Sequence, residues 1–138
     1  MPLPGPLVLG SSPFPQFNAG RHLMDGNDIN KIGGMLGSAE SGKTATAGGG
    51  RPTAYPIVAA NTEFSTVATG GDSCVLPVAY PGLRCAITNS GAASMQVFGN
   101  GSDTIQGTAG ATGVALANGA SAEYRCIVAG KWVRFVSS

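Results

Sequence analysis

Residues 120–136 read ASAEYRCIVAGKWVRFV and carry the clearest structural signal in the chain. Apolar and polar residues alternate through the first half, which is typical of a half-buried strand. One face of that strand would hold Ala122, Tyr124, Cys126 and Val128. The Ala129-Gly130 pair then interrupts the pattern, and a second apolar run containing Trp132 follows. Two such runs joined by a two-residue turn predict a β-hairpin with large side chains in a core.

Upstream of this hairpin the same pattern repeats as short apolar runs separated by Gly, Asn and Asp turns. The remaining strand candidates are residues 55–60, 63–69, 73–78, 83–89, 94–98, 104–106 and 113–117. Turn signals every eight to twelve residues or so are typical of a sandwich or barrel. The sequence therefore predicts an all-β domain over residues 53–138, a small antiparallel β-sandwich or jelly-roll-like barrel.

Residues 1–52 have a different composition, which predicts an extended N-terminal arm. Five prolines in the first twenty residues prevent a regular element there. Residues 23–36 have helical spacing and predict one short helix, and the Gly-rich residues 37–52 predict a linker. Apolar side chains along the arm are its expected partner-binding residues, and these are Leu7, Leu9, Phe14, Phe17, Ile29 and Ile32.

Composition and charge exclude several kinds of partner. The chain has 22 Gly and only 11% charged residues, with a net charge of +1. Affinity for nucleic acid depends largely on neutralised phosphates, so scattered basic residues predict no nucleic-acid partner. No apolar run reaches the roughly 20 residues that cross a bilayer, and the N-terminus lacks the basic region of a signal peptide, so no membrane partner is expected. The three cysteines lack metal-ligand spacing and predict buried reduced thiols.

Two short motifs suggest chemistry, but their surroundings do not. Residues 37–44, GSAESGKT, match the phosphate-binding pattern GxxxxGK[ST], yet that loop needs a strand before it and a helix after it. Residues 99–105, GNGSDTI, resemble one calcium-binding repeat, but such sites need stacked copies, so a turn is expected. His22 is the only histidine and has no nucleophile at a supportive spacing. The sequence predicts no catalytic residues, no cofactor and no metal site.

One resemblance covers roughly residues 70–136. It rests on residues 72–77 (DSCVLP), 87–91 (ITNSG), 103–110 (DTIQGTAG), 113–126 (GVALANGASAEYRC) and 130–132 (GKW). With these turn-and-strand motifs the chain resembles a β-rich module of tailed-bacteriophage virion proteins, and it is similar to capsid decoration (cement) proteins.

The resemblance implies a non-enzymatic virion structural protein, a head decoration protein that stabilises the capsid shell. Its implied partners are the major capsid protein and further copies of itself in a homotrimer. Its implied location is the capsid surface, after assembly in the bacterial host cytoplasm. The same motifs leave a tail-fibre or tail-tip module that binds a host surface as an alternative, and a nucleotide-dependent enzyme built on residues 37–44 ranks last.

Overall fold

A computed structural model of the protein describes residues 38–48 and 50–138. In this part of the chain eleven strands and one short 3-10 helix, η1 (Arg51–Thr53), form two sheets. The larger sheet has the order β1 (Ala39–Thr44), β3 (Asn61–Thr66), β5 (Arg84–Asn89), β10 (Ser121–Val128), β11 (Lys131–Ser137), β7 (Thr104–Ile105) and β8 (Thr108–Ala109). The smaller sheet has the order β2 (Tyr55–Pro56), β4 (Ser73–Val75), β6 (Met95–Phe98) and β9 (Val114–Leu116).

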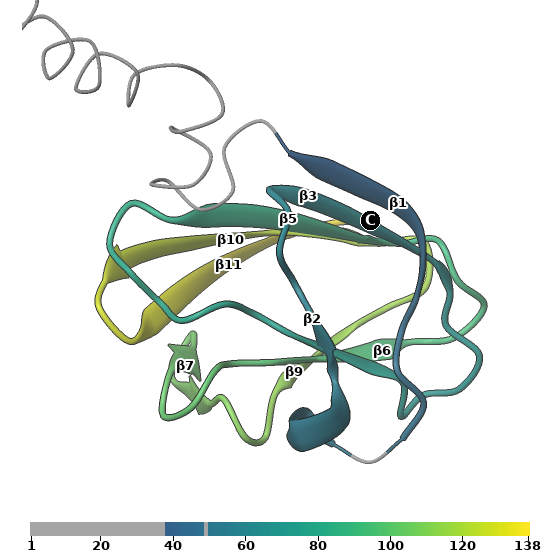
Figure 1. The fold of residues 1–138 in the computed structure, drawn as a ribbon, viewed down its shortest axis with the longest axis horizontal. Coiled ribbons are helices and arrows are strands. Elements are labelled where there is room, and N and C mark those ends of the chain that lie inside the picture. Colours follow the sequence, from purple (N-terminus) through teal and green to yellow (C-terminus); the bar gives the residue numbers. More distant parts are fainter. Residues whose placement is uncertain (1–37, 49) are drawn as a thin grey trace, which may run out of the picture. The chain divides into compact units, whose positions relative to one another are not determined.

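From β1 to β6 the chain winds between the two sheets as a β-solenoid. Odd-numbered strands enter the larger sheet and even-numbered strands the smaller one, so each strand pairs in parallel with the strand one coil earlier. Ala39 is thus the partner of Asn61, and Asn61 is the partner of Ala86. Figure 1 shows β1, β3 and β5 side by side in one layer, with β6 in the other.

Strands β9 and β10 run against this winding. β9 pairs antiparallel with β6, and β10 pairs antiparallel with β5, so the chain extends both sheets in the reverse direction. β11 then forms a hairpin with β10, and β7 adds to the far side of β11 in parallel. The hairpin predicted from residues 120–136 is therefore confirmed, and it lies within the larger sheet.

The predicted all-β class is confirmed, but the predicted antiparallel sandwich or barrel is wrong. Both sheets are mixed, and the layers arise from solenoid winding. The physical reason lies in the connections. A parallel pair needs a crossover of a dozen or more residues, and here each crossover contains a strand of the other sheet. The sequence pattern of short strands and turns is therefore the same in a solenoid with parallel pairs as in an antiparallel sandwich.

The nine predicted strands are all present, mostly shortened by a few residues, and β1 and β8 were missed. The prediction of a linker over residues 37–52 is wrong for Ala39–Thr44, which form β1 and pair with β3. Lys43 and Glu40 pair on this strand, and the Gly-rich composition of residues 37–52 as a whole does not predict this local contact. The predicted helix at 23–36 and most of the predicted arm lie outside the described residues.

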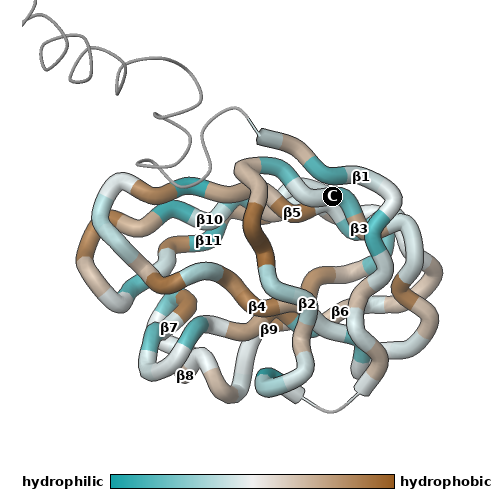
Figure 2. Tube along the Cα trace, in the orientation of Figure 1, coloured by the Kyte–Doolittle hydropathy of each residue, from teal (hydrophilic) through white to brown (hydrophobic). Residues whose placement is uncertain are grey.

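The core lies between the two sheets. Trp132, Tyr124 and Phe64 are its largest side chains, and each has at most 1% of its surface exposed. Cys74 and Leu116 of the smaller sheet face them from the other layer and are fully buried. Figure 2 shows apolar segments between the layers and also at the end where β10 turns into β11. Because the core fills the interlayer space, any binding site among the described residues must lie on an outer face, an edge or a loop.

Candidate functional site

The segment that matches the phosphate-binding pattern is an extended edge strand. Residues 39–44 pair along β3, with a register irregularity between Glu40 and Lys43. A phosphate-binding loop needs successive backbone N–H groups that converge on the ligand at the start of a helix. Within the described residues the chain continues from β1 through a bridge at Thr46 to the short η1, so this arrangement is not formed.

The Lys43 side chain already has partners. Its Nζ lies 3.4 Å from Glu40 Oε1, and the Tyr55 hydroxyl donates a hydrogen bond of 3.1 Å to Glu40 Oε2. The neighbouring Tyr55 hydroxyl and the Glu40 carboxylate raise the pKa of Lys43. Tyr55 is held in turn by an edge-to-face contact with Phe64, with ring centroids 5.3 Å apart. These contacts attach β1 to the body of the domain.

The segment that resembles a calcium-binding repeat forms a turn, as predicted. Its Asp103 carboxylate is buried and accepts a hydrogen bond of 2.8 Å from the Ala79 N–H. The Asp103 carbonyl accepts a second bond, 2.8 Å long, from the Gly110 N–H. Asn100 donates from its amide to the Leu76 carbonyl at 3.4 Å. The acidic residue of this motif therefore fixes the loop between β4 and β5 to the turn before β7.

The three cysteines are free and buried, as predicted. Burial raises the pKa of the Cys74 thiol well above its usual range and that of the Cys85 thiol to about 12. Because the thiolate is the nucleophile and the metal ligand, these thiols suit packing better than chemistry. Within residues 38–48 and 50–138, no group of three or more His, Cys, Asp or Glu side chains is placed to hold a metal ion.

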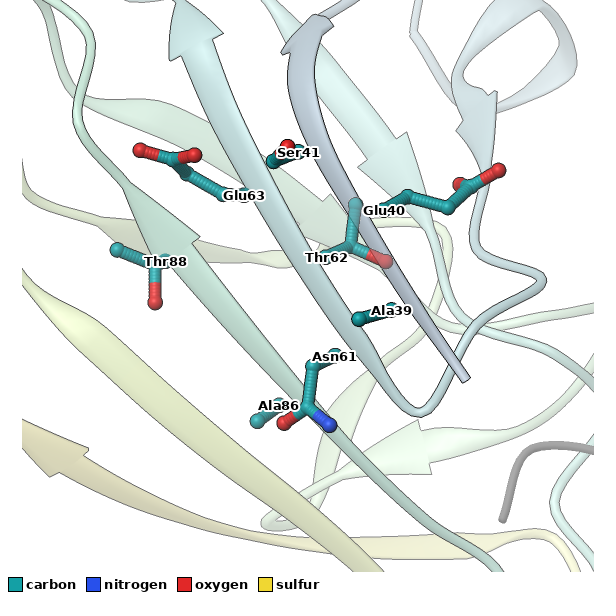
Figure 3. Close-up of a pocket in the computed structure, with 8 residues that line it drawn as sticks. All are labelled: Ala39, Glu40, Ser41, Asn61, Thr62, Glu63, Ala86 and Thr88. Atoms are coloured by element: carbon teal, nitrogen blue, oxygen red, sulfur yellow. The ribbon is translucent and has the colours of Figure 1, made fainter. Parts of the chain in front are cut away.

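The outer face of the larger sheet carries a shallow hollow of about 270 Å³ over β1, β3 and β5. Figure 3 shows Asn61 and Glu63 on the central strand, between small or hydroxyl-bearing side chains of the two neighbouring strands. Those flanking residues are Ala39, Ser41, Ala86 and Thr88. Glu63 Oε1 accepts a hydrogen bond of 2.9 Å from Ser90. The hollow is thus lined with hydrogen-bonding groups over a floor of small residues.

The same sheet carries a different surface where β10 turns into β11, which we name the hairpin face. It comprises the outward residues Arg84, Arg125, Ile127, Lys131, Val133 and Phe135. Ile127 is 69% exposed and Phe135 is 52% exposed. A cluster of large apolar side chains exposed to solvent is typical of an interaction site.

Arg125 is held firmly on the hairpin face. Its Nε and one terminal nitrogen donate to the two Glu123 oxygens, at 2.7 and 3.2 Å. Its guanidinium carbon lies 5.0 Å from the centre of the Phe135 ring. The bonds from Arg125, and the charges of Arg125 and Arg84, lower the pKa of the Glu123 carboxyl.

The loop between β4 and β5 lies against the hairpin and extends its apolar surface. Gly82 N–H donates to the Cys126 carbonyl at 2.7 Å, and Gly130 N–H donates to the Ala79 carbonyl at 3.0 Å. Tyr80 on this loop is 66% exposed, and Val78 is 46% exposed. The backbone of the loop is therefore fixed while two of its apolar side chains stay in solvent.

Leu7, Leu9, Phe14, Phe17, Ile29 and Ile32 all lie outside the described residues, as does His22. The hairpin face could not be predicted from the sequence, because its members come from three strands whose register the sequence does not give. The only feature of the sequence that pointed to this face was the apolar–polar alternation of residues 120–128, which places Glu123 and Arg125 on the side opposite the core.

Comparison with known proteins adds no relative: no family model, no curated protein and no solved structure matches this chain. In the part of the chain that the structure describes, no helix has the length and apolar character needed to span a bilayer.

Proposed function

We propose that the protein is a non-enzymatic structural protein of a tailed-phage virion, a head decoration (cement) protein that binds and stabilises the capsid shell. The resemblance of residues 70–136 to virion β-modules supports the proposal that this is a virion structural protein. The observation that carries it is the hairpin face, where Ile127 and Phe135 stand in solvent beside arginine side chains. Arginine and aromatic residues are enriched at protein–protein interfaces, so this composition favours a protein partner.

The energetics suit a contact made by several weak sites. Burying one large apolar side chain contributes about 1.5–3 kcal/mol, and part of that gain is offset by ordering and desolvation. Ile127, Tyr80 and Phe135 together would therefore give a modest affinity for each copy. Three copies on a symmetric shell would multiply such contacts through their high effective concentration. This supports the proposed homotrimer, with the major capsid protein and sister copies as partners.

The arm remains part of the proposal as a second contact. Leu7, Leu9, Phe14 and Phe17 are proposed to bury their side chains against a capsid protein or a sister copy. An extended segment spreads contact over a large area, and the apolar residues of 1–36 would then add affinity without changing the β-domain.

The test is co-sedimentation of the purified full chain with expanded capsid shells, beside sedimentation equilibrium of the chain alone. We expect saturable binding to shells and a trimer mass. Deleting residues 1–36 should weaken binding strongly while the urea unfolding midpoint of the β-domain stays within error. Full binding by the truncated chain would exclude the arm as a contact, and absence of shell binding by the full chain would exclude the decoration function.

A second candidate function is a tail-fibre or tail-tip module that binds a host surface. The hollow over β1, β3 and β5 favours it, because Ser41, Asn61, Glu63 and Thr88 present hydrogen-bonding groups suited to a polyhydroxylated surface. A module of this kind should bind host cells and ignore capsid shells. Asn61→Ala should then reduce cell binding, whereas a decoration protein should show no cell binding to reduce.

A further inference from the structure

Two arginines face each other across neighbouring strands of the larger sheet. Arg84 of β5 and Arg125 of β10 are direct cross-strand partners. Like charges in that position destabilise a sheet. Arg125 is compensated by Glu123 through two hydrogen bonds. The Arg84 side chain makes no hydrogen bond or ion pair with the residues that the structure describes, although its charge acts on Glu123. One carboxylate therefore serves two guanidinium groups.

The surroundings of this pair add positive charge. A hollow of about 340 Å³ is lined by Gly82, Leu83, Arg84, Arg125, Cys126 and Ile127. Lys131 is exposed on the adjoining strand and shares the outward face with Val133. Asp103 is the nearby acidic residue beneath the hairpin, but it is buried and accepts the Ala79 N–H. Among the described residues, the hairpin face thus presents three cations, and Glu123 beside it is the single carboxylate at the surface that compensates them.

Apolar side chains lie between these cations. Ile127 borders the arginine hollow directly, and Phe135 packs under the Arg125 guanidinium. The Phe135 ring and the Glu123 carboxylate together hold Arg125 in one orientation. A pre-organised guanidinium loses less side-chain entropy when it binds a carboxylate in a bidentate manner. The face therefore offers fixed cationic positions separated by apolar ones.

We infer that the hairpin face is the docking site for a segment of the major capsid protein in which Asp or Glu residues alternate with apolar residues. The inference rests on the proposed function, since that function supplies the capsid protein as the partner. Charge complementarity selects the acidic groups, because Arg84 has no full counter-charge among residues 38–48 and 50–138, and its hollow opens beside Ile127. Exposed Ile127 and Phe135 select the apolar groups. Nucleic acid fits less well, because its affinity depends on many phosphate contacts and three cations supply few.

The test uses the full chain and purified capsid shells in a co-sedimentation assay. Arg84→Gln and Ile127→Ser probe the hairpin face, while Lys43→Gln removes one positive charge from the distant strand β1. We expect Arg84→Gln to weaken shell binding about fivefold or more, and the Arg84→Gln/Ile127→Ser double variant to weaken it further. We expect Lys43→Gln to stay within about twofold of the wild type, and wild-type binding to weaken as salt increases.

A second readout separates docking from a structural role. Removing Arg84 relieves the like-charge pair, so the urea unfolding midpoint of Arg84→Gln should be unchanged or higher while its shell binding falls. A lower midpoint would indicate that Arg84 supports the fold, and this would overturn the inference.

Failure of the inference and failure of the proposed function give different results. If the wild type binds shells and Arg84→Gln binds equally well, the decoration function stands and the hairpin face is not the docking site. Equal losses in Arg84→Gln and Lys43→Gln would likewise overturn it, because the contact would then depend only on overall charge. If the wild type binds no shells, both proposals fail. Sedimentation of the shell-free chain identifies the remaining occupant, since an oligomer that Arg84→Gln dissociates would assign the face to a second copy.

Discussion

A matched pair of isoleucine substitutions tests the two-layer packing most directly. Ile87 on β5 is fully buried between the sheets, whereas Ile127 on the neighbouring strand β10 is 69% exposed. Ile87→Ala removes three carbon atoms from the core, which is about 2.4 kcal/mol of transfer free energy at about 0.8 kcal/mol per methylene. The cavity left behind adds to this, so the free energy of unfolding should fall by about 3–4 kcal/mol. Ile127→Ala should change it by no more than about 0.5 kcal/mol.

Urea unfolding followed by Trp132 fluorescence measures both values, because the ring is buried in the native core. The melting temperature of Ile87→Ala should fall by at least about 12 °C, given about 4–8 °C per kcal/mol for a domain of this size. If that variant does not fold, Ile87→Val should cost about 0.5–1.5 kcal/mol. A cost below about 1 kcal/mol for Ile87→Ala would refute the described packing. A cost above about 2 kcal/mol for Ile127→Ala would show that the hairpin face is covered in the free protein.

Three further predictions concern a backbone contact, an acidic turn and the thiols. An added Cβ at Gly110 would overlap the Asp103 carbonyl oxygen and lie 2.8 Å from Gly99 Cα. In urea unfolding, Gly110→Ala should therefore lower the free energy of unfolding by about 1–3 kcal/mol. Gly71 faces open space, so Gly71→Ala should be neutral in the same assay. The Asp72 carboxylate accepts hydrogen bonds from Thr69 Oγ1 and from the N–H groups of Thr69 and Ala68, and these bonds lower its pKa. The stabilisation that they give is therefore full above the unfolded-state pKa of about 3.9 and is lost as the pH falls through the lower folded-state pKa. The stability difference between wild type and Asp72→Asn should therefore shrink below about pH 4 in urea titrations, and a constant difference would contradict the role given to its charge. Because burial raises the pKa of Cys85 to about 12, iodoacetamide should leave it unlabelled in the native protein near neutral pH and label it in urea, as mass spectrometry would show.

The all-β class and the positions of most strands could be predicted from the sequence, because local signals decide them. The alternation in 120–136 and the turn at Ala129-Gly130 identify β10, β11 and their hairpin. The partners of β1 to β6 could not be predicted in the same way. Parallel pairing joins residues such as Ala39 and Asn61 across a crossover, and no local pattern records which strand lies beside which. β1 itself was missed because it lies in residues 37–52, whose Gly-rich composition resembles a linker, and it is stabilised by pairing and by Tyr55.

The candidate site could be predicted only in fragments. The sequence places Glu123 and Arg125 opposite the core-facing residues of their strand, as the structure confirms. It does not reveal that Arg84 lies opposite Arg125, since this depends on the β5–β10 register. It also does not reveal that Phe135 stays in solvent, because an apolar residue in a strand is more often buried. Tertiary register brings these residues together, and a single sequence does not encode it in any short motif.

The reversal of direction at β9 and β10 has a consequence for biosynthesis. β5 lies between β3 and β10, so it lacks one of its two neighbours until the chain has been translated through residues 121–128. The coils that are made first therefore expose the unpaired edge of β5 during synthesis. An unpaired strand edge is a template for pairing with another chain. Non-local pairing of this kind also folds slowly. High expression levels should thus favour aggregation of nascent chains, and slower synthesis at lower temperature should raise the yield of native protein.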